Sequence, residues 1–109
     1  MKSIYRLKKN YQYNYVYKHS HSVGDRNFLI LYCKSNISQS KVGFSISKKY
    51  GGAVERNRIR RQMKAVMSTL MPQVKNGYNL VIIPRKSEPY LHKDIVASLT
   101  KLLKRADLA

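Results

Sequence analysis

Three stretches of hydrophobic residues predict β-strands. Residues 26–34 (RNFLILYCK) are rich in strand-favouring residues and apolar on both faces, so we expect a buried strand. Residues 78–83 (YNLVII) form a similar run between a turn at Asn76 and Gly77 and a stop at Pro84. In residues 41–47 (KVGFSIS) apolar and small positions alternate, which predicts a strand with one face in the core. The core face carries Val42, Phe44 and Ile46, and the other face carries Gly43, Ser45 and Ser47.

Two further stretches have the periodicity of amphipathic helices. Residues 53–70 follow Gly51 and Gly52 and end before Pro72, which cannot continue a helix. Residues 92–105 show the same spacing near the end of the chain. The expected buried stripes are Ile59, Met63, Val66, Met67 and Leu70 on the first helix, and Ile95, Leu99, Leu102 and Leu103 on the second.

The tyrosine-rich segment at residues 5–19 has an ambiguous pattern. Its tyrosines recur at every second position from 11 to 17, as in a strand, whereas Tyr13, Val16 and Tyr17 have helical spacing. We favour a helix with Asn10 as a possible N-cap. On such a helix Tyr13 and Tyr17 share one side, while Tyr11 and Tyr15 point elsewhere.

The order of these elements predicts an α+β fold. The helix at residues 53–70 connects two predicted strands, which makes a βαβ unit. The chain has 109 residues, of which 43% are hydrophobic, enough for one modest core. No internal repeat and no linker divides it, so we expect a single domain over residues 1–109.

The charge balance indicates a polyanionic partner. Lys and Arg number 22 against five acids, which gives a formal net charge of +17. A folded domain with this charge repels itself unless a polyanion neutralises it. Nucleic acid and an anionic membrane both qualify, but the predicted core leaves little apolar surface for lipid, so we expect nucleic acid and no membrane.

The remaining composition favours the cytoplasm. No apolar stretch approaches the roughly 18 residues of a membrane span, and the start of the chain lacks the apolar run of a secretory signal. Cys33 is the single cysteine, so we expect it to be a small buried residue with no disulfide-linked partner.

One face of the helix at residues 53–70 is a candidate phosphate-binding surface. Asn57, Arg60, Arg61 and Lys64 recur with i, i+3, i+4, i+7 spacing and therefore share an exposed ridge. Before the helix, Lys48, Lys49 and a glycine pair form a turn whose amides could bind an anion. A charged run is ordinarily a solvated face, but Glu55 is the one acid near this cluster, which favours phosphate contact.

Other candidate chemistry is weaker. The early tyrosines are core packing, a platform on which unpaired bases stack, or both, and the cations interleaved with them are Arg6, Lys8, Lys9 and Lys18. His19 and His21 lie in a basic loop without nearby carboxylates, and with His92 they form a poor metal site, so we expect no metal on the protein. Five scattered acids offer no pair for acid–base work, so we expect no catalytic residue in the protein.

Residues 45–64 (SISKKYGGAVERNRIRRQMK) resemble the signature of the bacterial ribonuclease P protein subunit, S-x-S-K-K-x-G-x-A-V-x-R-N-x-x-K/R-R. The matching residues are Ser45, Ser47, Lys48, Lys49, Gly51, Ala53, Val54, Arg56, Asn57, Arg60 and Arg61. The similarity extends to a start of the type L-K-K-N followed by Phe-x-x-x-Phe, here Leu7, Lys8, Lys9, Asn10, Tyr13 and Tyr17. It continues in an R-x-F strand, here Arg26 and Phe28, and in a strand that ends before Arg85.

The resemblance implies a two-layer α/β sandwich of about four strands and three helices, with a left-handed βαβ crossover. It implies that the catalytic RNA subunit meets Lys48, Lys49, Arg56, Asn57, Arg58, Arg60, Arg61 and Lys64. It also implies a cleft for the 5′ leader of precursor tRNA, to which we assign Tyr13, Tyr17, Tyr32, Ser45 and Ser47. The family's strand aromatic in this cleft corresponds either to Leu31 or to Tyr32, and Gly52 replaces a frequent Asn.

The function implied is that of the protein component of an RNA-based endoribonuclease that matures the 5′ end of tRNA. The RNA subunit is then expected to perform the hydrolysis with bound Mg²⁺. Two rivals remain from the residues themselves: a ribosomal-type structural RNA-binding protein, and a metal-dependent nuclease acting alone, which the shortage of acids disfavours.

Overall fold

The computed structural model describes residues 1–85 and 89–109, and its regular elements follow the expected order. The elements are α1 (Asn10–His19), β1 (His21–Gly24), β2 (Phe28–Lys34), β3 (Lys41–Phe44), α2 (Ala53–Leu70), β4 (Tyr78–Pro84) and α3 (His92–Arg105). Three short 3-10 helices are η1 (Ser3–Tyr5), η2 (Lys48–Tyr50) and η3 (Met71–Gln73). The predicted bounds of both long helices are confirmed.

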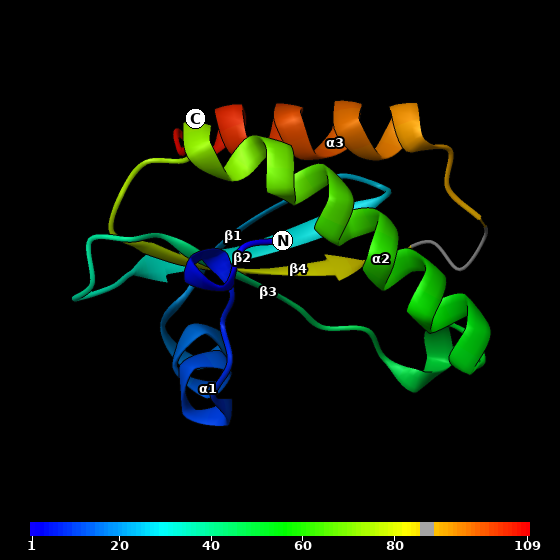
Figure 1. Cartoon of the computed structure of the whole chain (residues 1–109), viewed down its shortest axis with the longest axis horizontal. Coiled ribbons are helices and arrows are strands. Elements are labelled where there is room, and N and C mark those ends of the chain that lie inside the picture. Colours follow the sequence, from blue (N-terminus) through cyan, green and yellow to red (C-terminus); the bar gives the residue numbers. More distant parts are fainter. Residues whose placement is uncertain (86–88) are drawn as a thin grey trace.

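The four strands form one mixed sheet in the order β1-β2-β4-β3. β2 pairs antiparallel with β1 and β4, whereas β3 and β4 are parallel and are connected through α2. In Figure 1 the chain runs along β3, rises into α2, returns above the sheet and enters β4 behind β3. This path is left-handed, as the family resemblance implies, against the usual right-handed rule for such connections.

The main core lies between the sheet and the layer formed by α2 and α3 (Figure 1). The two predicted helical stripes are buried there, except Leu70, which is half-buried against the same core. From the sheet come residues of alternate positions, which are Phe28, Ile30, Val42, Leu80 and Ile82. The expected α/β sandwich is therefore confirmed.

The other face of the sheet carries α1 and a smaller core. Val16 of α1 is fully buried against Leu7, Cys33 and Val81, so Cys33 is the small buried residue that its sequence context suggests. This contact fixes α1 against β2 and β4 while leaving the flanks of the helix open. In Figure 1 α1 lies alone below the sheet.

Two local predictions are wrong at the start of the chain. β1 occupies part of the segment that we interpreted as a basic loop, where it pairs with β2 and packs Val23 on the main core. The helix begins at Asn10, within one residue of the start that an Asn10 N-cap predicts, and the chain before it lies along β3, where the Leu7 amide donates to the Val42 carbonyl 3.1 Å away. Asn10 is not the N-cap, since the Gln12 side chain accepts the Lys8 and Lys9 amides instead, each at 3.1 Å.

Two predicted strands are shorter than expected. β2 begins at Phe28 rather than residue 26, because the Asp25 carboxylate accepts the amides of Asn27 and Phe28 and closes a turn there. β3 ends at Phe44 rather than Ser47, although the Ser45 amide still donates to the Ile82 carbonyl. Pro84 on the neighbouring strand has no N–H with which to extend the ladder.

Candidate RNA interface

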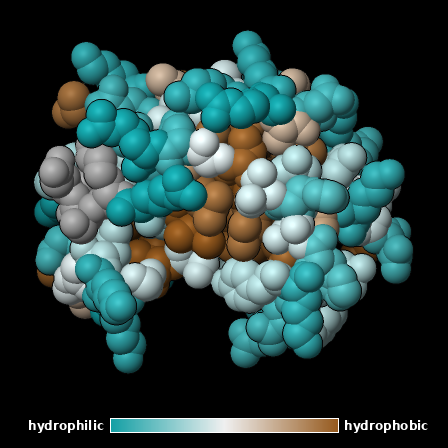
Figure 2. Space-filling view, turned by 180° about the vertical axis from the view of Figure 1, so that it is seen from behind, coloured by the Kyte–Doolittle hydropathy of each residue, from teal (hydrophilic) through white to brown (hydrophobic). Residues whose placement is uncertain are grey.

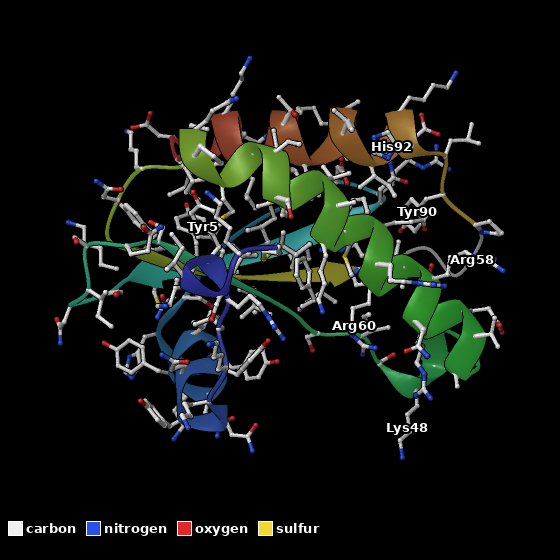
Figure 3. All side chains as sticks on the ribbon, in the orientation of Figure 1. Tyr5, Lys48, Arg58, Arg60, Tyr90 and His92 are labelled. Atoms are coloured by element: carbon white, nitrogen blue, oxygen red, sulfur yellow. The ribbon has the colours of Figure 1, made fainter. Side chains whose placement is uncertain are left out.

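We use the term basic ridge for the cationic residues of η2 and the exposed side of α2. It comprises Lys48, Lys49, Arg56, Asn57, Arg58, Arg60, Arg61 and Lys64. Most of these side chains are exposed, and Arg56, Arg60 and Lys64 are half-buried. In Figure 3, Lys48 and Arg60 project on the lower side of the molecule, where α1 also lies. The α2 surface opposite the buried stripe is therefore available to a partner.

The positive charge of the basic ridge is not neutralised within the described residues. The ion pairs found there join Lys75 to Asp107 and Lys101 to Asp25, and neither involves the ridge. Glu55 turns away from the arginines, because its Oε1 accepts the Gly52 amide at 3.2 Å. The prediction that the turn amides bind an anion needs correction here, since a carboxylate of the chain already caps the Gly52 amide.

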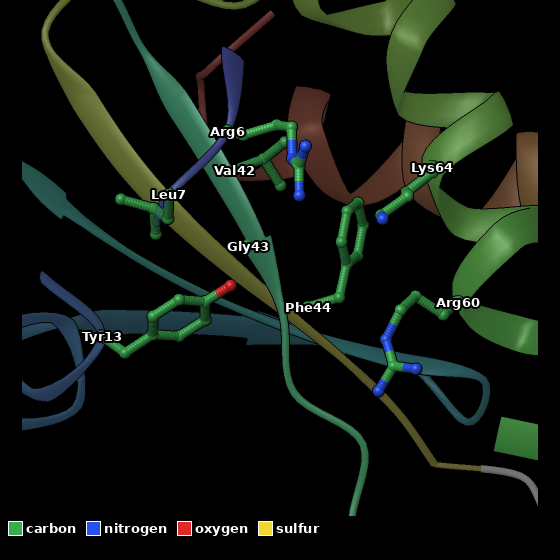
Figure 4. A pocket seen from close by; sticks show the side chains of 8 residues that line it. All are labelled: Arg6, Leu7, Tyr13, Val42, Gly43, Phe44, Arg60 and Lys64. Carbon is green, nitrogen blue, oxygen red and sulfur yellow. The ribbon is translucent and has the colours of Figure 1, made fainter. Parts of the chain in front are cut away.

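The basic ridge reaches a small pocket beside the edge strand β3. Figure 4 shows three cations, from Arg6, Arg60 and Lys64, around the ring of Phe44, with Tyr13 facing Gly43. The pocket measures about 160 Å³ and is completed by Leu7 and Val42. The pocket thus brings the start of the chain and α1 next to Arg60 and Lys64 of α2.

Tyr13 is the aromatic residue at this junction. Its side chain is half-buried, and burial raises the pKa of its phenol, against the opposing effects of the Phe44 backbone and the charges of Arg6 and Arg60. The phenol therefore remains protonated at neutral pH and can donate a hydrogen bond. Tyr17 lies one turn further along α1, with ring centroids 6.5 Å apart, and is 46% exposed.

The floor beside α1 is apolar. Leu31 and Ile83 are half-buried and pack against the smaller core on the α1 side of the sheet. Figure 2, which views the molecule from behind, shows apolar side chains in a hollow between two more polar lobes. A groove with an apolar floor, an aromatic flank and a cationic flank can hold the bases and the phosphates of an unpaired strand.

The structure decides between Leu31 and Tyr32. Leu31 lies on the α1 side with Tyr13, whereas Tyr32 packs against the main core and lies 5.8 Å from the His21 ring. Successive residues of a strand face opposite sides of the sheet, so Tyr32 cannot line the same cleft as Tyr13. The assignment of Tyr32 to that cleft is corrected to Leu31.

The two predicted serines lie between the cleft and the basic ridge. Ser45 is half-buried and Ser47 exposed in the segment that leads from β3 to η2. Sequence reasoning missed Phe44 as a site residue, left Leu31 as one of two alternatives, and named Arg6 only as a cation beside the tyrosines. Arg6 bridges Val42 in parallel, and nothing in its local sequence signals this contact.

The structure offers no protein-borne metal centre in the residues that it describes. No group of three or more His, Cys, Asp and Glu side chains lies close enough there to hold an ion. Within the same residues, no helix combines the length and the hydropathy needed to cross a bilayer.

A basic, acid-poor ridge beside an aromatic groove on an α+β sheet defines an RNA-binding domain. The Ribonuclease P family model matches residues 1–107. The chain therefore belongs to the ribonuclease P protein family, whose members are the protein subunits of the ribonucleoprotein endoribonuclease for tRNA 5′ processing.

Individual relatives agree over nearly the whole chain. The ribonuclease P protein component of Clostridioides difficile is 39% identical over 105 residues, covering 94% of this chain and 92% of the relative. That of Finegoldia magna is 36% identical over 102 residues, covering 93% and 89%. The solved structure of the Staphylococcus aureus RNase P protein matches with a TM-score of 0.85 at 31% identity, covering 95% of this chain and 96% of that one.

Proposed function

We propose that this protein binds the catalytic RNA subunit of ribonuclease P through the basic ridge and the 5′ leader of precursor tRNA in the groove beside α1. The observation that carries the proposal is the shared pocket, in which Arg60 and Lys64 meet Tyr13. A strand held at Tyr13 would then lie next to the RNA bound on α2. The protein can thereby align the substrate with the RNA subunit.

The groove provides two kinds of contact for an unpaired leader. Tyr13 and Tyr17 offer aromatic faces for bases, and stacking contributes about 1–3 kcal/mol per base. Arg6, Arg60 and Lys64 offer charge for the phosphates between them. These contacts are independent of base sequence, as the binding of varied leaders requires.

The chemistry is assigned to the RNA subunit. Mg²⁺ held by that RNA would stabilise the attacking and leaving oxygens of the hydrolysed phosphodiester. The described residues of the protein do not fit a magnesium site, because they contain no cluster of carboxylates. The part of the protein is to bind the leader and to neutralise repulsion between RNA segments, which lowers the Mg²⁺ requirement. We place this activity in the cytoplasm.

Reconstituted cleavage tests the proposal. The chain and a ribonuclease P RNA subunit are combined with precursor tRNA at low Mg²⁺, and the 5′ end of the product is mapped. We expect correct mature ends only when both subunits are present. Cleavage by the chain alone would contradict the assignment of chemistry to RNA and would favour the independent nuclease.

Binding measurements test the groove separately. Tyr13→Ala should weaken affinity for precursor tRNA by about 1–3 kcal/mol while leaving mature tRNA nearly unaffected. Tyr13→Phe is the matched control, because it keeps the ring and should retain most of the preference for precursor. Equal losses for both RNAs would argue against leader binding and would favour a structural RNA-binding role of the ribosomal type.

A further inference from the structure

We propose that the side of α1 turned away from Tyr13 binds a second stretch of unpaired RNA, by stacking bases on Tyr11, Tyr15 and His19. We call the surface formed by Tyr11, Tyr15 and His19 the outer stripe. The proposal requires only that the chain binds single-stranded RNA, and it adds a contact to the proposed function that the leader groove does not supply.

The outer stripe is a continuous aromatic surface. Its three residues recur every fourth position, so they lie above one another on one side of the helix. Tyr11 is 70% exposed and Tyr15 is 53% exposed. The rings of Tyr15 and His19 lie 4.4 Å apart between centroids. Large aromatic rings that are exposed together in this way mark an interaction site.

Two hollows extend along the outer stripe, and both include Tyr15 and Lys34. The first hollow lies between α1 and the segment after β2, and is lined also by Tyr11, Gln12, Ser35, Asn36, Ile37 and Asn79. The second lies beside the β1 edge, and is lined also by His19, His21, Tyr32, Cys33 and Tyr78. Because they share two residues, the two hollows lie next to each other along the aromatic side of α1.

Charge identifies the occupant as a polyanion. Lys34 is exposed and lines both hollows, and Lys18 is exposed on α1 nearby. No carboxylate is among the residues that line either hollow. Aromatic rings next to cations suit alternating bases and phosphates. Ile37 is the single exposed aliphatic side chain among the residues that line the two hollows, so they offer little apolar surface to a protein partner.

Asn79 provides an independent sign of a missing ligand. Its Oδ1 is buried and accepts no hydrogen bond within the described residues, yet the side chain lines the first hollow. A buried amide oxygen without a partner is energetically costly, so such groups are rare unless a ligand or water donates a hydrogen bond to them. An amino group on the edge of a stacked base could donate to this oxygen.

The outer stripe is separate from the leader groove. Tyr13 and Tyr17 lie on the other side of α1, and the body of the helix with its buried Val16 stands between the two surfaces. One short strand therefore cannot stack on both sets of rings at once. The two surfaces can be disabled independently.

Fluorescence anisotropy with the full-length chain tests the proposal. The probe is a labelled, unstructured RNA of about ten nucleotides with mixed sequence. Tyr11→Leu combined with Tyr15→Leu keeps apolar volume but removes stacking, and should weaken binding about tenfold or more. Tyr17→Leu, combined with Tyr13→Leu, is the matched pair on the groove side. If each double variant binds the RNA more weakly than the wild type and the quadruple variant binds it more weakly still, both surfaces contact the RNA.

Urea unfolding of each variant controls for folding, since the outer-stripe positions are exposed and should leave the midpoint nearly unchanged. Photocrosslinking of the same RNA, substituted with 4-thiouridine, should label Tyr15 or its tryptic peptide even in the Tyr13→Leu, Tyr17→Leu variant. An unchanged affinity for the outer-stripe variant would overturn the proposal, whether or not cleavage with the RNA subunit succeeds. Self-association that disappears in the outer-stripe variant would also overturn it, by assigning the surface to a second copy of the chain.

Discussion

The Tyr13 ring packs so closely against the backbone of Gly43 that no larger residue fits at position 43. A Cβ atom placed on Gly43 would lie 2.4 Å from the Tyr13 hydroxyl oxygen and 2.5 Å from the ring carbon that bears it. Both distances are far below van der Waals contact. The glycine on the α1 face of β3 therefore sets the position of the groove aromatic, and it does so through close approach rather than through backbone conformation.

Gly43→Ala should displace the Tyr13 ring and weaken the binding of precursor tRNA by about 1 kcal/mol, part of a stacking contribution. Mature tRNA should bind as before, and the binding of both RNAs can be measured by filter retention. A double-mutant cycle is the control: in the Tyr13→Ala background the extra methyl group meets no ring and should cost nothing further. Additive losses would mean that Gly43 acts through another contact.

The basic ridge should determine how binding responds to salt. Arg60→Ala with Arg61→Ala removes two exposed or half-exposed cations, so affinity for the RNA subunit should fall and the slope of log K against log salt should flatten by about 1 per lost phosphate contact. Lys93→Ala with Lys104→Ala removes the same charge from α3, on exposed positions away from the ridge. This control should change the slope much less. Equal slopes for all three proteins would contradict the ridge as the docking surface.

The regular helices were predictable because local signals define them. The apolar period of α2 and α3 exceeds three turns, and Pro72 and the glycine pair limit α2. The short strand β1 was not predictable. It has four residues, and Val23 alone among them packs on the core, so its sequence has no alternation that would indicate a strand. The strand is stabilised by its pairing with β2.

The site was predictable where it lies on one helix and not where it depends on tertiary contacts. The spacing of Arg60, Arg61 and Lys64 was sufficient to place them on one ridge. The addition of Arg6 depends on a bridge to Val42, thirty-six positions away in the chain. Both faces of β2 are apolar because both are covered, so alternation could not decide between Leu31 and Tyr32.

Ser40 is a structural polar residue in the core that sequence reasoning did not identify. Its hydroxyl donates to the Lys75 carbonyl and accepts the Tyr78 amide at 3.0 Å, and the residue is 1% exposed. Ser40→Ala leaves two partly buried backbone groups without this partner, so we expect a loss of about 1–2 kcal/mol in the free energy of unfolding. Urea denaturation measures it, with exposed Ser38→Ala as control. A loss below that of the control would show that water replaces the hydroxyl.

Asp25 should make stability depend on acid pH. Burial alone would raise the pKa of its carboxyl, but the Phe28 and Asn27 amides, Ser98 and Lys101 favour the charged form and together lower the pKa. The Lys101 ammonium lies 3.3 Å from Oδ2. In the unfolded chain the pKa of an Asp side chain is about 3.9. The contribution of Asp25 to the free energy of unfolding is therefore fully present above that pH and is lost as the pH falls through the lower pKa of the folded protein.

Asp25→Asn should therefore be less stable than the wild type at pH 7, and the gap in the free energy of unfolding should narrow below about pH 4. The reason is that a protonated Asp25, like Asn, no longer pairs with Lys101 as an anion. Urea denaturation of both proteins at pH 7, 4 and 3 measures the gap. Asp94→Asn is the control, because Asp94 is exposed on the first turn of α3 and outside the observed ion pairs of the described residues, so its gap should stay small throughout. If the difference in the free energy of unfolding between wild type and Asp25→Asn is the same at every pH, the substitution destabilises the fold through poorer packing, and the charge of Asp25 contributes little.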